Sequence, residues 1–152
     1  MIRRLIAVLA VIAVALPTSA LAHWRFTQWG MTPAQVKAAA RGSLRDDGGG
    51  PRDTVMGQNR KLSGVLWINW RRYQAEFYFS DADHLTLVRL KPRKARDCGR
   101  VIAEMKAHYG PSDDAHHGVW TDPNTGDGVT QSFSEQHAYC YATYRKPGLP
   151  IG

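Results

Sequence analysis

Hydrophobic and polar side chains alternate most clearly in the middle of the chain. Between positions 71 and 79 every second residue is hydrophobic, namely Tyr73, Ala75, Phe77 and Phe79. A period of two puts these side chains on one face of a β-strand and predicts that this face is buried. Segments 61–70 and 84–90 have a similar β-branched and aromatic character, and turn signals lie near Arg71 and at 80–83. We therefore expect three antiparallel strands joined by hairpins.

A short helix is expected after Thr32. Thr32 is suited to cap it, the proline that follows is favoured at the first helical position, and Gln35 completes a capping box with Thr32. The helix should continue to about Arg41 and end at Gly42, because glycine readily adopts the left-handed conformation that follows a helix. Segment 43–53 contains consecutive glycines and little apolar surface, which predicts a flexible loop.

A second helix is expected over residues 94–109. Hydrophobic side chains recur there at spacings of three and four, which describes one buried stripe of a helix: Ala95, Cys98, Val101, Ile102, Met105 and Tyr109. Gly110 and Pro111 should end this helix. Three short strands are expected after it, at 119–121, 129–133 and 139–144.

These elements predict a fold of the α+β class, with two helices packed on one antiparallel β-sheet. Residues 23–152 are close to the commonest size for one domain, so we expect a single α+β domain.

Residues 1–22 have the pattern of a cleaved secretory signal peptide. Arg3 and Arg4 precede an apolar run over 5–16, and small residues surround the expected cleavage site after Ala22. The run is shorter than the roughly 20 residues that a membrane-spanning helix needs. We therefore expect a periplasmic or secreted protein, with no membrane span in the mature chain.

The two cysteines are predicted to form a disulfide bond. An even pair in an exported protein favours this reading, and no C-x-x-C motif points to redox chemistry. Cys98 lies on the buried stripe of the second predicted helix, and alternation puts Cys140 and Ala142 on one face of the last strand. The bond would join helix to sheet.

Charge indicates what kind of partner to expect. The formal net charge of +7 becomes +5 when Arg3 and Arg4 leave with the signal peptide, and a basic protein favours acidic partners. Outside the cytoplasm we expect no nucleic acid, so the candidates are anionic lipid head groups, cell-wall polymers or an acidic protein surface. The alternative is a solvated basic surface without a partner.

Two groups of residues are candidates for binding. Alternation places Trp67 on the opposite strand face from Leu66 and Ile68, and Tyr78 opposite Phe77, so Trp67 and Tyr78 would form an exposed aromatic patch. The alternative is that both rings are buried.

The second group is basic and lies where the third strand leads into the second helix. Arg93, Lys94 and Arg96 stand near a positive helix N-terminus, which suits a phosphate or a carboxylate. The alternative is a run of solvated charges.

Other chemistry has weaker signals. His116 and His117 are metal-ligand types without a recognised spacing, and His23 would be an N-terminal copper ligand. Segment 122–128 resembles a calcium loop superficially but lacks the EF-hand glycine and glutamate positions, so a hairpin turn explains it better. No catalytic motif is present, hence an enzyme is not favoured and no cofactor or metal site is expected.

The chain also resembles a group of small exported bacterial proteins. The residues that carry the likeness are W-G-M-T-x-x-x-V over 29–36, Phe77-Tyr78-Phe79, Cys98 and Tyr109-Gly110-Pro111. They look like the small outer-membrane-assembly lipoproteins of the SmpA/OmlA type and the modules of β-lactamase inhibitory protein. The resemblance implies binding without catalysis, through a sheet face or loops. The chain departs from these proteins in having no lipid-bearing cysteine after the cleavage site and no second copy of the module.

The sequence therefore predicts an exported, non-catalytic binding protein that engages a protein or an anionic envelope component. The competing hypothesis is a metal-binding protein or metal-dependent enzyme built on surface histidines.

Overall fold

The computed structural model describes residues 23–48, 50, 53–112, 117–134 and 139–150. The predicted signal peptide, residues 1–22, lies outside the described residues. None of the helices in the described part of the chain has the length and apolar character needed to cross a membrane.

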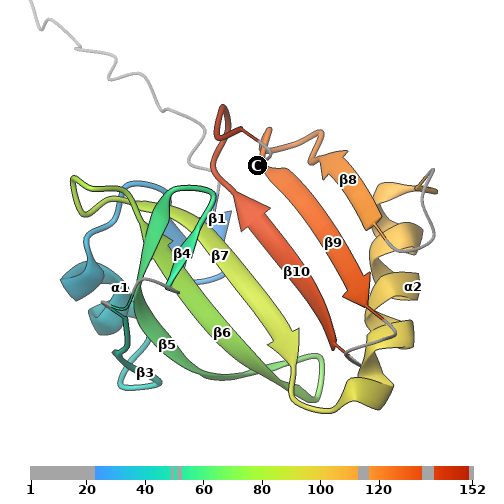
Figure 1. The fold of residues 1–152 in the computed structure, drawn as a ribbon, viewed down its shortest axis with the longest axis horizontal. Helices are drawn as coiled ribbons and strands as arrows, with labels where there is room; N and C mark the ends of the chain where they lie inside the picture. The colour runs from blue at the N-terminus through green and yellow to red at the C-terminus, as the bar shows by residue number, and fades with distance from the viewer. Residues whose placement is uncertain (1–22, 49, 51–52, 113–116, 135–138, 151–152) are drawn as a thin grey trace, which may run out of the picture.

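Antiparallel strands dominate the structure (Figure 1). The main sheet has the strand order β3 (Leu44–Asp46), β5 (Gln58–Ile68), β6 (Arg71–Phe79), β7 (Leu85–Pro92), β10 (Tyr139–Arg145), β9 (Gly128–Ser134), β8 (His117–Thr121), and β4 (Thr54–Val55) also pairs with β5. A separate small sheet joins β1 (His23–Trp24) to β2 (Thr27–Gln28). The helices are α1 (Pro33–Ala39) and α2 (Cys98–Tyr109), and a 3-10 turn, η1 (Ala95–Asp97), precedes α2.

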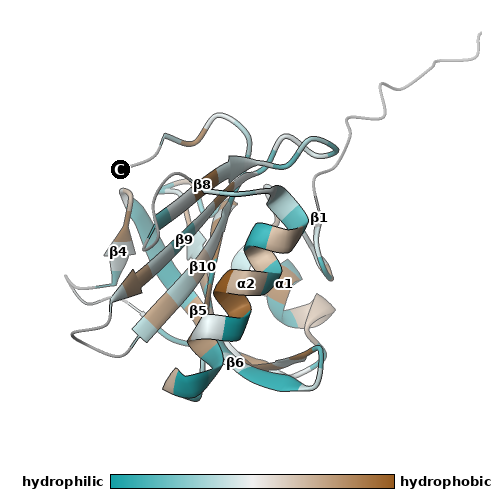
Figure 2. Cartoon of the chain, turned by 90° about the vertical axis from the view of Figure 1, so that its right-hand side faces the viewer, coloured by the Kyte–Doolittle hydropathy of each residue, from teal (hydrophilic) through white to brown (hydrophobic). Residues whose placement is uncertain are grey.

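The expected α+β class, with two helices packed on one antiparallel sheet, is wrong. The main sheet is eight-stranded, and the two helices of the described chain are short beside it (Figure 2). Four strands were not expected from the sequence, namely β1, β2, β3 and β4. Each has only two or three residues, too few for a period of two to be recognised.

The hairpin strands expected in the middle of the chain are confirmed as β5, β6 and β7. Phe77 on β6 pairs with Leu62 on one side and Val88 on the other, and all three side chains are fully buried. The chain then passes through α2 to the far edge of the sheet and returns through β8 and β9. As a result β10, the last strand, pairs with β7 at the centre of the sheet.

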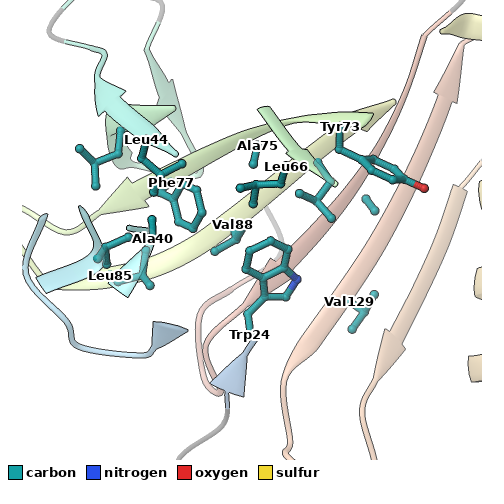
Figure 3. Close-up of a cluster of buried hydrophobic side chains, with 14 of the residues drawn as sticks. Trp24, Ala40, Leu44, Leu66, Tyr73, Ala75, Phe77, Leu85, Val88 and Val129 are labelled. Atoms are coloured by element: carbon teal, nitrogen blue, oxygen red, sulfur yellow. The ribbon is translucent and has the colours of Figure 1, made fainter. Parts of the chain in front are cut away.

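Aromatic packing connects the N-terminal segment to the sheet (Figure 3). The ring of Trp24 lies 5.8 Å from that of Phe77 on β6 and 6.0 Å from that of Tyr144 on β10, and Phe26 packs 6.2 Å from Trp24. Such pairs add specific geometry to the burial of large apolar surfaces. Trp24, which closely follows the expected cleavage site, is thus part of the core, and Phe26 packs against it.

The first helix has the predicted start and an earlier end. The Thr32 side chain accepts from the backbone of Gln35, and the Gln35 side chain accepts from the backbone of Thr32, so the capping box is confirmed. The helix ends at Ala39 instead of Arg41, because Arg41 has a positive φ of 50°. Within the loop predicted at 43–53, the structure places strand β3 on the edge of the sheet.

The predicted disulfide bond is confirmed. Cys98, the first residue of α2, is bonded to Cys140 on β10, with 5.7 Å between their Cα atoms. Both residues are buried. The bond fixes the N-terminal end of α2 to the strand that completes the centre of the sheet.

Removing this bond should destabilise the protein strongly. The bond closes a loop between positions 42 residues apart, and loop-closure entropy predicts a loss of about 4 kcal/mol for a Cys98→Ala, Cys140→Ala variant. Urea unfolding of the variant and of the oxidised parent measures this difference. A loss below about 1 kcal/mol would contradict the assignment of the bond as a main source of stability.

Candidate functional site

The tip of the β5–β6 hairpin has an unusual residue in its turn. Asn69 and Trp70 form a two-residue connection between the paired residues Ile68 and Arg71, with positive φ angles of 47° and 63°. Positive φ at both positions is what a type I′ hairpin turn requires, and glycine is the preferred second residue. A bulky side chain in this conformation costs on the order of 1–2 kcal/mol.

A second hairpin of the same chain provides the comparison. Met56 and Gly57 connect the paired residues Val55 and Gln58 with φ angles of 51° and 70°. There glycine occupies the position that Trp70 occupies in the β5–β6 turn. Turn geometry alone therefore does not account for the tryptophan.

Burial does not account for Trp70 either. Its side chain is 95% exposed, and Trp67 on the adjoining strand is 64% exposed. With Asn69 the two indoles line a shallow hollow at the tip. Large aromatic side chains that add little to the core and carry a backbone cost are candidates for contact with a partner.

Basic side chains surround these tryptophans. A cleft of about 690 Å³ lies between the hairpin tip and the β7–α2 junction, and its lining includes Trp67, Trp70, Arg72, Arg93, Lys94 and Arg100, which we call the basic–aromatic cleft. Arg72 lies directly across the hairpin from Trp67, with its guanidinium carbon 5.8 Å from the indole centroid. Asp97, half-buried, is the acidic residue in the described lining.

The backbone holds the two basic segments beside each other. The Arg93 N–H donates to the carbonyl of Arg72 at 3.1 Å, which continues the pairing of β7 with β6 beyond the last residue of β7. The turn η1 then directs the chain into α2, where Arg100 lies in the first turn. Within the described part of the chain, Arg72, Arg93, Lys94 and Arg100 are exposed and form no ion pair. Arg71, which also lines the cleft, is half-buried and pairs with Glu104.

The structure brings together only some of the residues predicted to bind. Trp67, Arg93 and Lys94 lie in the same cleft, although the sequence pattern predicts the tryptophan and the basic segment as two separate sites. Arg96 is exposed in η1 and does not line the cleft. The expectation that Tyr78 shares an exposed patch with Trp67 is wrong, because Tyr78 is fully buried.

Trp70 was missed because the strand was predicted to continue through it. The pattern over 61–70 predicts one strand with a turn near Arg71, whereas the chain reverses at Asn69 and Trp70. The available signal was Asn69, a residue that tolerates positive φ and is common at the first position of such turns.

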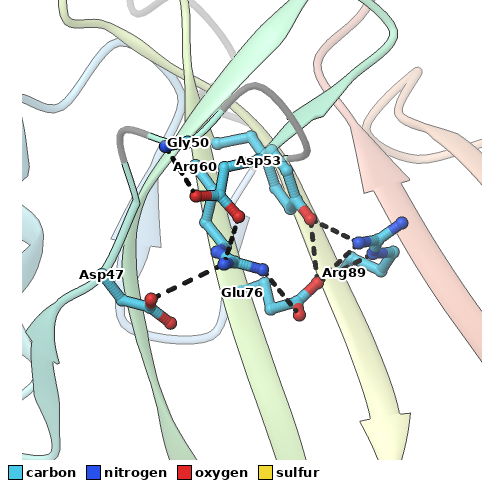
Figure 4. A network of polar contacts seen from close by, with 7 residues as sticks. Asp47, Gly50, Asp53, Arg60, Glu76 and Arg89 are labelled. Atoms are coloured by element: carbon cyan, nitrogen blue, oxygen red, sulfur yellow. Dashed lines mark hydrogen bonds and ion pairs between the residues drawn. The ribbon is translucent and has the colours of Figure 1, made fainter.

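Tyr78 contacts Glu76 and Arg89, which belong to the ionic network shown in Figure 4. As the neighbour of Phe77 on β6, Tyr78 lies on the other face of the sheet. Its hydroxyl donates to Glu76 at 2.8 Å and accepts from Arg89 at 2.5 Å. Glu76 also accepts from Arg89 Nε at 2.9 Å and from Arg60 at 3.3 Å, and Arg89 stacks 4.6 Å from the ring centroid of Tyr141. Burial raises the pKa of Tyr78, which keeps the hydroxyl protonated as a donor.

The carboxylates around Arg60 complete this network. Arg60 pairs with Asp53 and lies 3.6 Å from Asp47, and the Asp53 carboxylate also accepts from the backbone N–H of Gly50. These charged groups are half-buried and pair with one another, and Arg60 Nε is buried without a hydrogen-bond partner among the described residues. We therefore assign the network a structural role that anchors the segment before β4 to the sheet.

The histidine hypothesis gains no geometric support from the described residues. Asp113, Asp114 and His116 lie outside them, as does the side chain of His23, and His117 is exposed on β8. In the part of the chain that the structure describes, no group of three or more potential metal ligands converges.

Segment 122–128 forms a turn, as the sequence suggested. The Asp122 carboxylate accepts from the backbone N–H groups of Asn124 and Thr125 at 2.8 and 3.2 Å. Asp127 accepts from the Trp29 indole at 2.8 Å and is buried. These carboxylates therefore have structural partners.

Comparison with known proteins returned no match to a protein family, a curated protein or a solved structure.

Replacing Glu76 tests the ionic network. A Glu76→Gln variant keeps the size of the side chain but removes the negative charge between Arg60 and Arg89, so we expect a loss of about 2–3 kcal/mol in the free energy of unfolding. Glu104→Gln is the matched control, since Glu104 pairs with Arg71 at a more exposed position and should cost less than about 1 kcal/mol. Equal effects in urea unfolding would contradict the structural role of the network.

Replacing Trp70 tests whether the indole serves the fold. A Trp70→Gly variant should keep the stability of the parent or gain up to about 1 kcal/mol, because glycine removes the cost of positive φ. The reciprocal Gly57→Trp variant has open space around its Cβ and should lose about 1–2 kcal/mol. Thermal and urea unfolding measure both. A clear destabilisation of Trp70→Gly would show that the indole supports the fold.

Proposed function

We propose that this protein is a non-catalytic binding protein that engages an anionic partner through the basic–aromatic cleft. The observation that carries the proposal is the placement of two exposed tryptophans among four exposed cations that lack ion pairs within the described residues. Core packing, turn geometry and internal ion pairing each leave this arrangement unexplained.

The cleft combines two kinds of contact. Arg72, Arg93 and Arg100 present planar guanidinium groups that recognise phosphate or carboxylate in bidentate fashion, and Lys94 adds a compact charge. Trp67 and Trp70 offer apolar surfaces with a polar N–H edge, which suits a partner that is charged at one end and apolar beside it. Tryptophan and arginine are also the side chains most enriched in binding hot spots.

We propose the cell envelope as the place of action. The signal-like pattern over residues 1–22 and the disulfide bond, a bond typical of oxidising compartments, support export. The resemblance to SmpA/OmlA-type proteins and to the modules of β-lactamase inhibitory protein supports binding as the activity. Anionic lipid head groups and phosphate-bearing polymers are the partners in that compartment whose charge complements the cleft.

Charge variants test the proposal on the His23–Gly152 protein. The cleft variant carries Arg72→Gln, Arg93→Gln and Lys94→Gln. The control variant carries Arg41→Gln, Arg45→Gln and Lys146→Gln, which remove the same net charge at exposed positions outside the cleft. Binding of soluble polyphosphate is measured by calorimetry at two salt concentrations.

We expect the cleft variant to bind polyphosphate about 100-fold more weakly than the parent, since each cation contributes roughly 1 kcal/mol to attraction of an anionic surface. The control variant should bind within about three-fold of the parent. Equal weakening in both variants would show that net charge alone accounts for the change in affinity and would contradict a role for the cleft. Absence of polyphosphate binding by the parent would overturn the proposal.

A further inference from the structure

Beside the basic–aromatic cleft lies a second cavity of different character. It has a volume of about 270 Å³ and lies between α2 and the sheet. Most of its lining is apolar and includes Ile68, Leu90, Val101, Met105, Ala142 and Tyr144. An apolar cavity of about 150 Å³ is already large enough to hold benzene, so this one has room for several carbons of a hydrocarbon chain.

The two cavities meet at the β5–β6 turn. Asn69 lines both of them. Arg71, which lines the basic–aromatic cleft, donates to both oxygens of Glu104, which lines the apolar cavity, at 2.9 and 3.0 Å. This ion pair connects the linings of the two cavities. Because the Glu104 side chain is 48% exposed, the pair adds little stability and opens at small cost.

The apolar cavity is open to solvent at one side, since the exposed residues Glu104 and His108 belong to its lining, and its floor is formed by buried core residues such as Val101, Met105 and Ala142. Apolar surface in an open hollow stays in contact with water, so an apolar occupant that covers it gains the free energy of burial. Met105, on the helix side, has a flexible side chain that adapts to an irregular occupant. On the sheet side burial raises the pKa of Tyr144, as expected of a phenol in surroundings of low polarity.

We propose that the apolar cavity takes the hydrocarbon chain of a single-chain anionic lipid whose charged head group lies in the basic–aromatic cleft. Charge complementarity selects the head group, and the position of the apolar cavity next to the cleft, with Asn69 in both linings, places the chain. The inference names the ligand class of the basic–aromatic cleft and therefore rests on the proposed function.

Alkyl phosphates of increasing length test the inference below their micelle-forming concentrations. Ethyl, octyl and dodecyl phosphate share one head group, and dodecyl maltoside presents the longest chain on a neutral head. We expect affinity for the His23–Gly152 protein to rise by up to about four-fold per added methylene until the cavity is filled. Dodecyl maltoside should bind at least ten-fold more weakly than dodecyl phosphate.

An Ala142→Leu variant fills the cavity from β10. It should bind dodecyl phosphate at least ten-fold more weakly than the parent and polyphosphate equally well. The control, Ala34→Leu, adds the same volume at an exposed position on α1 and should leave both affinities unchanged. As a measurement on the unmodified protein, methyl resonances of Val101 and Met105 should shift on titration with dodecyl phosphate and stay in place with ethyl phosphate.

The outcomes separate this inference from the proposed function. Affinity independent of chain length, with polyphosphate binding intact, would overturn the lipid site and leave the anion-binding function standing; the cavity would then suit an apolar side chain of a protein partner. Dodecyl maltoside binding as tightly as dodecyl phosphate would overturn the requirement for an anionic head. Absence of polyphosphate binding by the parent protein would overturn both proposals.

Discussion

The pairing of β7 with β10 holds the two halves of the molecule together. Val88 and Leu90 on β7 pair with Tyr144 and Ala142 on β10, and the four side chains face the buried cluster on the α2 side of the sheet. The first half of the chain would otherwise end at β7 as an open edge, which is a liability for a sheet. By joining the last strand to the centre, this pairing creates the surface on which α2 lies and the apolar cavity between them.

The two faces of the central sheet perform different tasks. One face carries the buried hydrophobic cluster that contains Phe77, and Trp24 packs against this face. The opposite face carries half-buried charged groups that pair with one another, with Glu76 between Arg60 and Arg89. Removing such charges from water is costly unless each is paired, so the network specifies one arrangement of its residues more than it adds net stability. That explains why a cluster rich in arginine and tyrosine contributes to structure and does not form the candidate site.

The candidate site includes a turn residue that the local backbone geometry disfavours. At the Val55–Gln58 hairpin the chain uses Gly57, the residue that turn geometry favours, whereas at the β5–β6 tip it uses Trp70 at positive φ and almost fully exposed. Departures from the locally favoured residue are expected at functional positions, because selection for binding there competes with selection for stability. The neighbouring cations agree with this interpretation, since unpaired like charges repel one another unless a counter-charge is bound.

The sequence by itself determined the features that depend on neighbouring residues. Alternation over 71–79 and the Thr32–Gln35 capping box act within a few positions, so strand β6 and the start of α1 followed from local pattern, and helical spacing together with alternation was enough to orient Cys98 towards Cys140. Only the tertiary structure decided that the chain is mostly β-sheet, that Tyr78 is buried in an ionic network, and that Trp67 lies beside Arg93 and Lys94. These outcomes depend on which strands pair. Pairing is set by burial and hydrogen bonding between segments far apart in the chain, and a short stretch of sequence carries no information about those distant segments.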